Sequence, residues 1–313
     1  MRTRRSVFGM VAAVGMIALL VGCTSGSQTV PSLRLSDRNR DARAVSRHLV
    51  FVSDYLANTI DMYDDQGNVF TPAGAITRGI DGPLGTFVDQ TGTLYVTNLL
   101  VNTVAEYVPT STVPTVTLTA GISGPMNVAV DARGDIAVGQ YAQQISSIVE
   151  FKKGAEQPNV RITSLTYPAG VAFDAKRLLW VAWNVQGNNG LVGHVSTCKL
   201  FTSKCANTGI TIGQTGGIAI DSAGDLVLGD QTHSAIDVFA PGATKPYRKI
   251  KMASHDPYGF SFDKPERHLD VADYTTGTIV IYDFATGQQV GSIAQGLTSA
   301  WGVSLSPAAG YGP

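Results

Sequence analysis

Residues 85–98 read GTFVDQTGTLYVTN, and this stretch decides the fold because its pattern returns along most of the chain. It holds a glycine, a short apolar run, an aspartate, a turn ending in glycine, and a second apolar run. An Asp at the first position and a Gly at the fourth are typical of a type I turn, and such a turn closes a β-hairpin. The stretch therefore predicts two antiparallel strands, with the aspartate serving the turn rather than catalysis.

The residue that ends the first apolar run recurs at a nearly constant interval. It is found at Asp89, Asp131, Asp174, Asp221 and Asp263, and Ser306 takes the sixth place. Successive markers are 42, 43, 47, 42 and 43 residues apart. Four residues before each marker stands a glycine, or Asn127 in one case, and both residue types tolerate unusual backbone angles. A fixed period of this kind indicates a repeat architecture.

Each repeat continues with two more apolar runs. A third run follows a polar break, as in residues 103–107 and 278–282, and a weaker fourth run ends the unit, as in residues 289–293. Four short strands in each repeat, with no helical period, are typical of a β-propeller blade. The chain is therefore predicted to be an all-β, six-bladed β-propeller with four-stranded antiparallel blades.

The two ends of the repeat region complete each other. Residues 298–306 supply only a first strand, whereas residues 49–53, 59–63 and 75–80 supply three strands without a first one. We expect the N- and C-terminal strands to pair in one blade, because this closes the ring and leaves no open sheet edge. Residues 48–313 are thus predicted to be one domain.

Some repeats match a known pattern. Residues 94–98 (LYVTN) with 102–104 (NTV), and residues 49–54 with 58–60, resemble NHL-type and YVTN-type propeller repeats. The resemblance covers about residues 48–307. Relatives with this architecture include streptogramin lyases, gluconolactonases, peptidylglycine lyases and pure binding platforms, so the resemblance implies the fold and not the function.

Residues 1–22 are predicted to be an export signal. Three arginines among the first five residues precede an uncharged, apolar stretch at 6–22, which is at the lower margin of a membrane-spanning length. Leu20-Val21-Gly22-Cys23 resembles the lipobox of bacterial lipoproteins. The resemblance implies diacylglyceryl attachment to Cys23, cleavage before it, and a lipid-anchored protein of the bacterial cell envelope that faces the periplasm or the exterior. Several acyl chains hold a protein stably in a bilayer. An uncleaved N-terminal anchor helix is the alternative.

Charge separates a tether from the domain. The whole chain has a net charge of −1, and only 15% of its residues are charged. Without a polybasic surface, no nucleic-acid partner is expected. Residues 24–47 carry five arginines against two aspartates, whereas residues 48–313 have a net charge of −7. We interpret residues 23–47 as a lipidated flexible tether, and contact with anionic head groups is the alternative.

The propeller topology gathers a candidate site at one axial mouth. The starts of the first strands and the ends of the second strands share a face, and an aromatic-walled hollow with a few polar groups is the usual ligand site. On this face we expect Met126, Trp183, Tyr258, Trp301 and Asp273 to meet a small molecule, a glycan or a protein. The alternatives are that Asp273 caps a loop and that Trp183 covers its blade.

An enzyme is the alternative function. His255, His233 and Asp230 would converge across two neighbouring blades as a hydrolase or lyase site, with histidine as the base. The first strands, however, carry no acid or histidine before their turns, which is unlike the metal-dependent propeller lactonases. The glycines recur with the blade period rather than as a phosphate-binding loop. We therefore predict a binding or scaffold propeller with no metal and no cofactor.

Two cysteines lie in the repeat region. Cys198 and Cys205 flank six residues in the longest repeat, and cysteine pairs outside the cytoplasm are usually oxidised. We predict a disulfide that staples a hairpin on the face opposite the mouth. A redox-active pair is the alternative.

Overall fold

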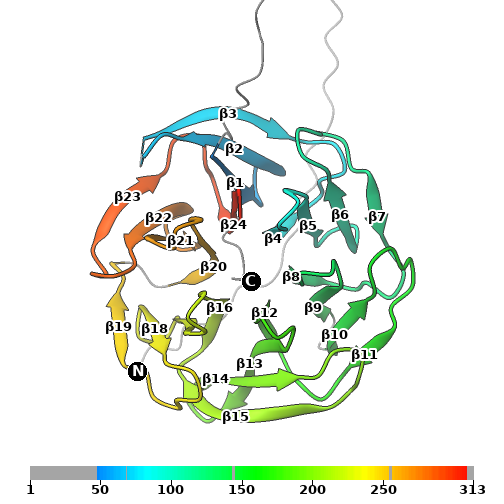
Figure 1. Ribbon diagram of the computed structural model, residues 1–313, viewed down its shortest axis with the longest axis vertical. Coiled ribbons are helices and arrows are strands. Elements are labelled where there is room, and N and C mark those ends of the chain that lie inside the picture. Colours follow the sequence, from blue (N-terminus) through cyan, green and yellow to red (C-terminus); the bar gives the residue numbers. More distant parts are fainter. Residues whose placement is uncertain (1–47, 68, 143–144, 254–255, 309–313) are drawn as a thin grey trace, which may run out of the picture. The chain divides into compact units, whose positions relative to one another are not determined.

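The fold is known from a computed structural model, which describes residues 48–308 except 68, 143–144 and 254–255. The described residues form 24 strands in six four-stranded antiparallel sheets, which stand around a common axis (Figure 1). The predicted all-β, six-bladed β-propeller is confirmed. Within these ranges there is no helix of the length and apolarity that crossing a membrane requires.

Blade 1 joins the two ends of the chain, as predicted. Its strand order is β24-β1-β2-β3, and β24 pairs with β1 through partners such as Leu49 with Ser306 and Val52 with Val303. The strands are β24 (Ala300–Ser306), β1 (Leu49–Asp54), β2 (Thr59–Asp65) and β3 (Phe70–Ile76). The prediction of a strand at residues 75–80 was wrong in position. Gly79 and Gly82 adopt positive φ angles, so the chain after Ile76 turns toward the next blade.

Blades 2 to 6 follow in chain order, each from the axis outward. Blade 2 holds β4 (Pro83–Val88), β5 (Leu94–Asn98), β6 (Thr103–Tyr107) and β7 (Val116–Leu118). Blade 3 holds β8 (Pro125–Val130), β9 (Ile136–Ala142), β10 (Ile145–Phe151) and β11 (Val160–Ile162). Blade 4 holds β12 (Pro168–Phe173), β13 (Leu179–Gly187), β14 (Gly190–Cys198) and β15 (Cys205–Ile212). Blade 5 holds β16 (Thr215–Ile220), β17 (Leu226–Asp230), β18 (Ala235–Phe239) and β19 (Arg248–Lys251). Blade 6 holds β20 (Pro257–Phe262), β21 (His268–Asp273), β22 (Thr278–Asp283) and β23 (Gln289–Ile293).

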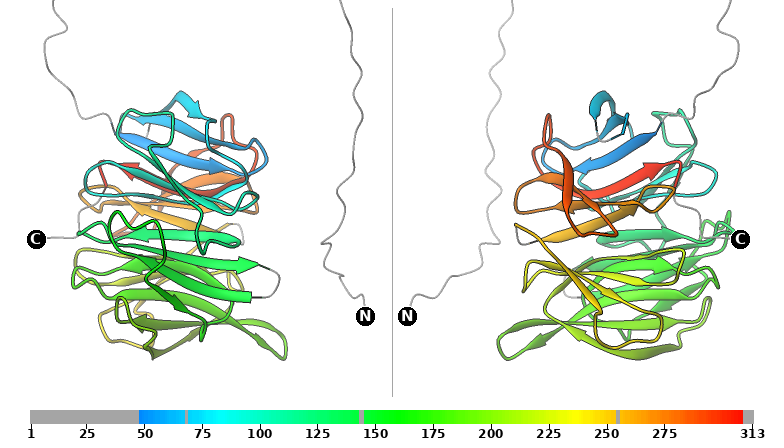
Figure 2. Two further views of the ribbon diagram at one scale, coloured as in Figure 1. Left: turned by 90° about the vertical axis from the view of Figure 1, so that its right-hand side faces the viewer. Right: turned by 60° about the vertical axis from the view of Figure 1, so that its left-hand side comes forward.

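The ring has two distinct faces, and the strands run between them (Figure 2). Because neighbouring strands are antiparallel, every first strand begins on the face that also carries the loops between second and third strands. We call this the mouth face. The turns between first and second strands, and between third and fourth strands, lie on the opposite face. The core fills the spaces between blades, as where Val227 and Ile236 of blade 5 pack with Phe262 and Leu269 of blade 6.

The repeat aspartates cap turns on the opposite face. One carboxylate oxygen of Asp89 accepts hydrogen bonds from the backbone N–H groups of Thr91 at 2.8 Å and Thr93 at 3.0 Å, and Gly92 has φ 83°. Asp131, Asp174, Asp221 and Asp263 make equivalent bonds in their own turns. A carboxylate fixed to backbone donors in this way keeps the turn closed, which confirms that these residues have a structural role.

The glycine at the start of each first strand is required for a reason other than the one expected. Gly85 and Gly217 are not among the positive-φ residues. A Cβ atom on Gly85 would lie 2.7 Å from the Asn127 Cα, and one on Gly217 would lie 1.9 Å from the Tyr258 carbonyl oxygen. At these glycines the inner strands therefore approach each other too closely for a side chain. In blade 3 the equivalent residue is Asn127, whose side-chain amide donates a hydrogen bond to the Ala169 carbonyl.

Candidate functional site

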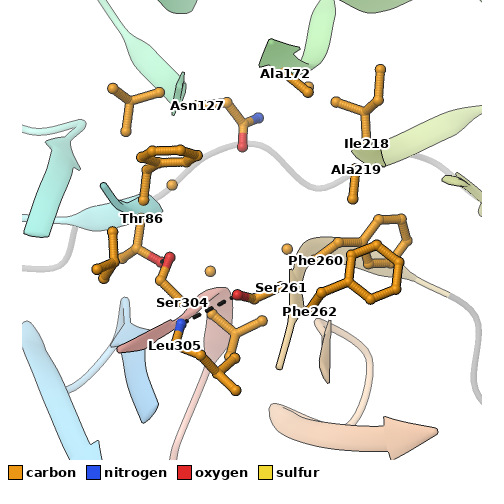
Figure 3. A pocket seen from close by; sticks show the side chains of 18 of the residues that line it. Thr86, Asn127, Ala172, Ile218, Ala219, Phe260, Ser261, Phe262, Ser304 and Leu305 are labelled. Atoms are coloured by element: carbon orange, nitrogen blue, oxygen red, sulfur yellow. Dashed lines mark hydrogen bonds between the residues drawn. The ribbon is translucent and has the colours of Figure 1, made fainter. Parts of the chain in front are cut away.

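The first strands enclose a narrow axial channel (Figure 3). Its volume is about 120 Å³, and its wall is mostly backbone and small or apolar side chains of the six first strands. Hydrogen bonds join neighbouring strands around it, such as Ser304 Oγ to Thr86 Oγ1 at 2.9 Å and the Leu305 N–H to Ser261 Oγ at 3.2 Å. A channel this small, with polar backbone and side-chain atoms in its wall, holds water or a small ion more readily than a drug-sized ligand.

An aromatic cluster lies where the channel meets the mouth face. Trp301 at the start of β24 packs in a tilted arrangement against Tyr258 of β20 at 4.7 Å and against Tyr274 at 4.4 Å between ring centroids. Tyr55 lies 6.1 Å from Trp301, and Tyr258 lies 5.9 Å from Tyr274. Tyr258 also lines the channel, and Tyr274 is 43% exposed. The cluster thus reaches from the axis to solvent, which is the arrangement of an aromatic binding surface.

Buried polar groups without partners lie in and beside this cluster. The Trp301 indole N–H and both polar atoms of the Gln231 amide make no hydrogen bond to any described residue. Gln231 is 7% exposed and lies beside the Tyr258 phenol. Burial raises the pKa of Tyr258, and the neighbouring Gln231 amide opposes that rise. Unsatisfied buried polar groups are costly, and a bound partner removes the cost.

Asp273 lies on the mouth face but is occupied by its own loop. Its carboxylate accepts the Thr275 N–H at 3.1 Å, and its side chain is buried. Asp54 likewise accepts the Ala57 N–H of its own loop at 3.1 Å, and it also accepts the Ser299 N–H at 3.1 Å and the Thr298 hydroxyl at 2.6 Å from the segment before β24. Asp273 therefore caps the loop that carries Tyr274, and it positions the cluster rather than forming its surface.

Trp183 and Met126 belong to other parts of the face. The Trp183 N–H donates to Ser196 Oγ at 3.0 Å, and its ring lies 5.0 Å from that of His194 across β13 and β14. Trp183 packs on the core between blades 3 and 4, as a cover of its blade would. Met126 is half-buried at the start of β8. Among the described residues, no ring contact joins Trp183 to the aromatic cluster.

The alternative catalytic residues are placed in part. His233 Nδ1 lies 2.7 Å from Asp230 Oδ2, and Asp230 also accepts the His233 backbone N–H at 3.1 Å. Asp230 is buried, whereas the His233 side chain is 63% exposed. The second bond makes Asp230 a loop cap like Asp273. His255 lies outside the described residues. In the described ranges no three histidine, cysteine, aspartate or glutamate side chains gather as a metal site.

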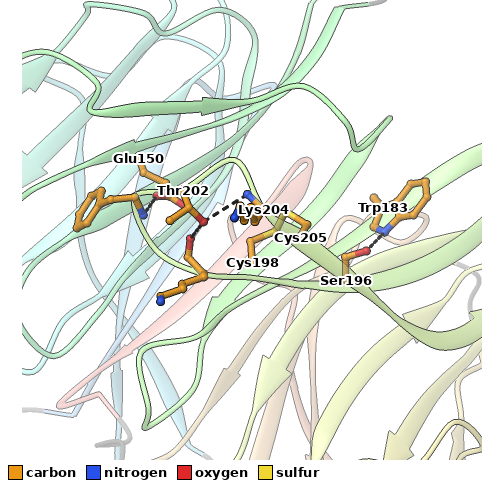
Figure 4. Close-up of a disulfide and its surroundings, with 9 residues drawn as sticks. Glu150, Trp183, Ser196, Cys198, Thr202, Lys204 and Cys205 are labelled. Atoms are coloured by element: carbon orange, nitrogen blue, oxygen red, sulfur yellow. Dashed lines mark hydrogen bonds between the residues drawn. A yellow bond between two sulfur atoms is a disulfide. The ribbon is translucent and has the colours of Figure 1, made fainter.

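The predicted disulfide is formed. Cys198 at the end of β14 bonds to Cys205 at the start of β15, and it closes the hairpin at residues 199–204 on the opposite face (Figure 4). Cys198 is fully buried. The hairpin also reaches blade 3, since the Phe201 N–H donates to Glu150 Oε2 at 2.5 Å. The bridge therefore closes the hairpin within blade 4, and the Phe201–Glu150 hydrogen bond links that hairpin to blade 3.

The sequence prediction omitted Tyr55, Tyr274 and Gln231. All three occupy one repeat position, directly after the residue that ends a second strand: Asp54, Asp273 and Asp230. The shared position was a usable signal, because it places the side chain in the loop between second and third strands. The contacts of Tyr55 and Tyr274 with Trp301 form only because ring closure brings blades 6 and 1 side by side.

Exposed aliphatic residues extend the aromatic surface around the mouth face. Leu56 is 71% exposed in the loop after β1, and Leu100 is 60% exposed in the loop after β5. Gly82 links these two loops by hydrogen bonds. Its N–H donates to Asn58 Oδ1 in the loop after β1 at 2.7 Å, and its carbonyl accepts the N–H of Leu99 in the loop after β5 at 2.9 Å. The loops of blades 6, 1 and 2 therefore present apolar side chains next to one another.

Comparisons with known proteins support the fold alone. No family model and no curated protein matches the chain. A chain of the nidogen/laminin complex matches with a TM-score of 0.66 and 16% identity, over 85% of this chain and 99% of that one. The hydrazine synthase of Kuenenia stuttgartiensis matches with a TM-score of 0.60 and 13% identity, over 83% and 86%. A protein of unknown function from Desulfotomaculum acetoxidans matches with a TM-score of 0.60 and 12% identity, over 82% and 98%.

Proposed function

We propose that the protein is a membrane-tethered, extracytoplasmic binding propeller of the NHL/YVTN type. Residues 1–22 direct export, lipid on Cys23 anchors the chain, and residues 23–47 tether the ring. The ligand or partner binds on the mouth face at Tyr55, Tyr258, Tyr274 and Trp301.

One observation carries the binding role: a cluster of closely packed aromatic rings adjoins buried polar groups that have no partner among the described residues. The rings offer apolar area at low entropic cost, and the Trp301 N–H and Gln231 amide offer directed hydrogen bonds. Faces of sugar rings and small planar molecules meet both requirements, because they combine a stacking surface with hydroxyl or carbonyl groups. A glycan or a small polar molecule is therefore the favoured class, and a protein partner is the other. The nidogen/laminin complex shows only that a similar fold occurs within a protein–protein complex.

Trp301→Phe tests the mouth site. The substitution keeps an aromatic ring but removes the unpartnered N–H, so a ligand found by screening glycans and metabolites should bind about tenfold more weakly. The measurement is isothermal titration calorimetry on the chain from residue 24 onward, with Trp183→Phe as the matched control. Equal loss in both variants, or no loss in either, would exclude Trp301 as the recognising group.

Cys23→Ser tests the anchor. Without the thiol no diacylglyceryl group attaches, and the protein should leave the membrane fraction. Fractionation with metabolic labelling by a clickable fatty acid reports both lipid and location. Labelled lipid on the variant, or unchanged retention, would show that Cys23 is not the anchor.

A hydrolase or lyase remains the second candidate, because Asp230 and His233 form a close pair. An aspartate bonded to one histidine nitrogen leaves the other nitrogen free to act as a base. A screen of lactone and ester substrates, followed by His233→Gln, tests this role. Turnover that disappears in the variant would support an enzyme, and turnover that persists would place the chemistry elsewhere.

A further inference from the structure

A second cavity lies on the opposite face, away from the mouth. It has a volume of about 360 Å³ and lies between blade 1 and blade 2. Its floor is formed by Phe51 of β1, Ile76 of β3, Leu94 of β5 and Tyr107 of β6, which are all buried. Leu49 and Met62 complete the apolar wall.

The lining contains no charged side chain. The Tyr107 hydroxyl is already used, since it donates to the Arg78 carbonyl at 2.7 Å. The rim of the cavity is formed by the segment 108–112, which includes Thr110 and Thr112, and by Ser306. Val108 in this segment is 43% exposed. The cavity therefore has an apolar floor and a neutral, hydroxyl-bearing rim next to solvent.

Two local features keep this space open. β3 carries a bulge at Ala73, because Met62 pairs with Gly74 and Tyr63 pairs with Pro72. A bulge bends its strand, and the residues at this bend have small side chains. At the rim, Thr110 has φ 68°, which is rare for a β-branched residue and persists only where the surroundings hold it. The rim segment is thus held in one conformation beside the opening.

We propose that this cavity binds an uncharged, mainly aliphatic small molecule, with its polar end at the hydroxyl rim. Engineered apolar cavities of about 150 Å³ stay dry and bind benzene, and ligand pockets begin at about 300 Å³. Burying a charge here would be costly, since no lining side chain would pair with it. The site is separate from the mouth face and does not depend on the function proposed there.

Binding of the neutral fluorophore N-phenyl-1-naphthylamine tests the site. The protein is the chain from residue 24 onward, which contains every strand of the ring. We expect one molecule to bind per chain with blue-shifted emission. Ala73→Leu and Met62→Phe place extra atoms in the cavity and should weaken binding at least tenfold. Tyr274→Ala, in the mouth cluster, is the control and should bind as the unaltered chain does.

Two results would overturn the proposal: full binding by both filled variants, or loss of binding in Tyr274→Ala. A chain beginning at residue 44 should bind equally well; tighter binding by more than tenfold would make residues 24–43 the occupant instead. If the filled variants do not fold, competition by a series of 1-alkanols on the unaltered chain decides. Affinity should rise about fourfold per methylene and then stop once the cavity is full. An uninterrupted rise, or no competition, would contradict a bounded apolar site.

Discussion

Glu150 shows how a single buried carboxyl group links two blades. It lies fully buried in β10, with one oxygen bonded to Phe201 of the disulfide hairpin and the other without a partner among the described residues (Figure 4). Burial, aided by the nearby Asp135 carboxylate, raises its pKa to about 7 against the opposing bond from Phe201. The folded state therefore holds this proton more firmly than the unfolded chain does.

Glu150→Gln should change how stability depends on pH. Because the folded pKa lies above the unfolded one, the stabilisation is present below about pH 4.5 and is lost as the pH rises to about 7. Between these pH values we expect the unfolding free energy to fall by about 1–2 kcal/mol once solvent screening is included. The fall should be absent in Glu150→Gln, which has no titrating group at this position. Urea unfolding at pH 5, 6, 7 and 8 measures it. The exposed Glu156→Gln is the control, and identical pH slopes for Glu150→Gln and the unaltered chain would refute the assignment.

At the scale of the element, the close approach of inner strands explains why glycine recurs with the blades. Gly217→Ala would bring a Cβ to 1.9 Å from the Tyr258 carbonyl, whereas Gly139→Ala in β9 meets its nearest atom at 3.5 Å. We expect the first variant to lose about 2–3 kcal/mol of unfolding free energy and the second less than about 1 kcal/mol. Urea denaturation separates them. Comparable losses would mean that strand contact is not the cause.

Strand positions were predicted well where the apolar run coincides with the strand. The run at residues 103–107 has the observed bounds of β6, and the weaker run at residues 289–293 has those of β23 although only Ile293 in it is buried. β3 was misplaced because Ile76 and Ile80 are both buried, so the apolar run extends past the end of the strand. The turn aspartates were predicted correctly because their chemistry is local. The aromatic cluster was predicted only as Tyr258 and Trp301, since its other members meet them through tertiary contacts.

For the whole molecule, closure of blade 1 decides whether the ring exists. β24 is the first strand of that blade and lies between β1 and the axis, so its loss would leave the edge of β1 open. Open edges pair with other chains. The prediction of closure succeeded because the C-terminal end of the repeat region has a first strand without the other three, and the N-terminal end has three strands without a first one.

Truncation after residue 298 should therefore remove cooperative unfolding and cause aggregation. Truncation after residue 308 keeps all strands and should retain a single transition with a nearly unchanged midpoint. Circular dichroism melting with light scattering compares the two. A cooperative, monomeric product of the shorter chain would mean that blade 1 is stable without its C-terminal strand.

The pairing of Leu49 with Ser306 also gives the ring a direction. Both residues lie on the opposite face, so the domain's polypeptide enters and leaves on the side away from the aromatic mouth. On a chain anchored at Cys23, the tether would join the ring on the face that carries the aliphatic cavity, and the aromatic mouth would lie on the face away from that attachment point.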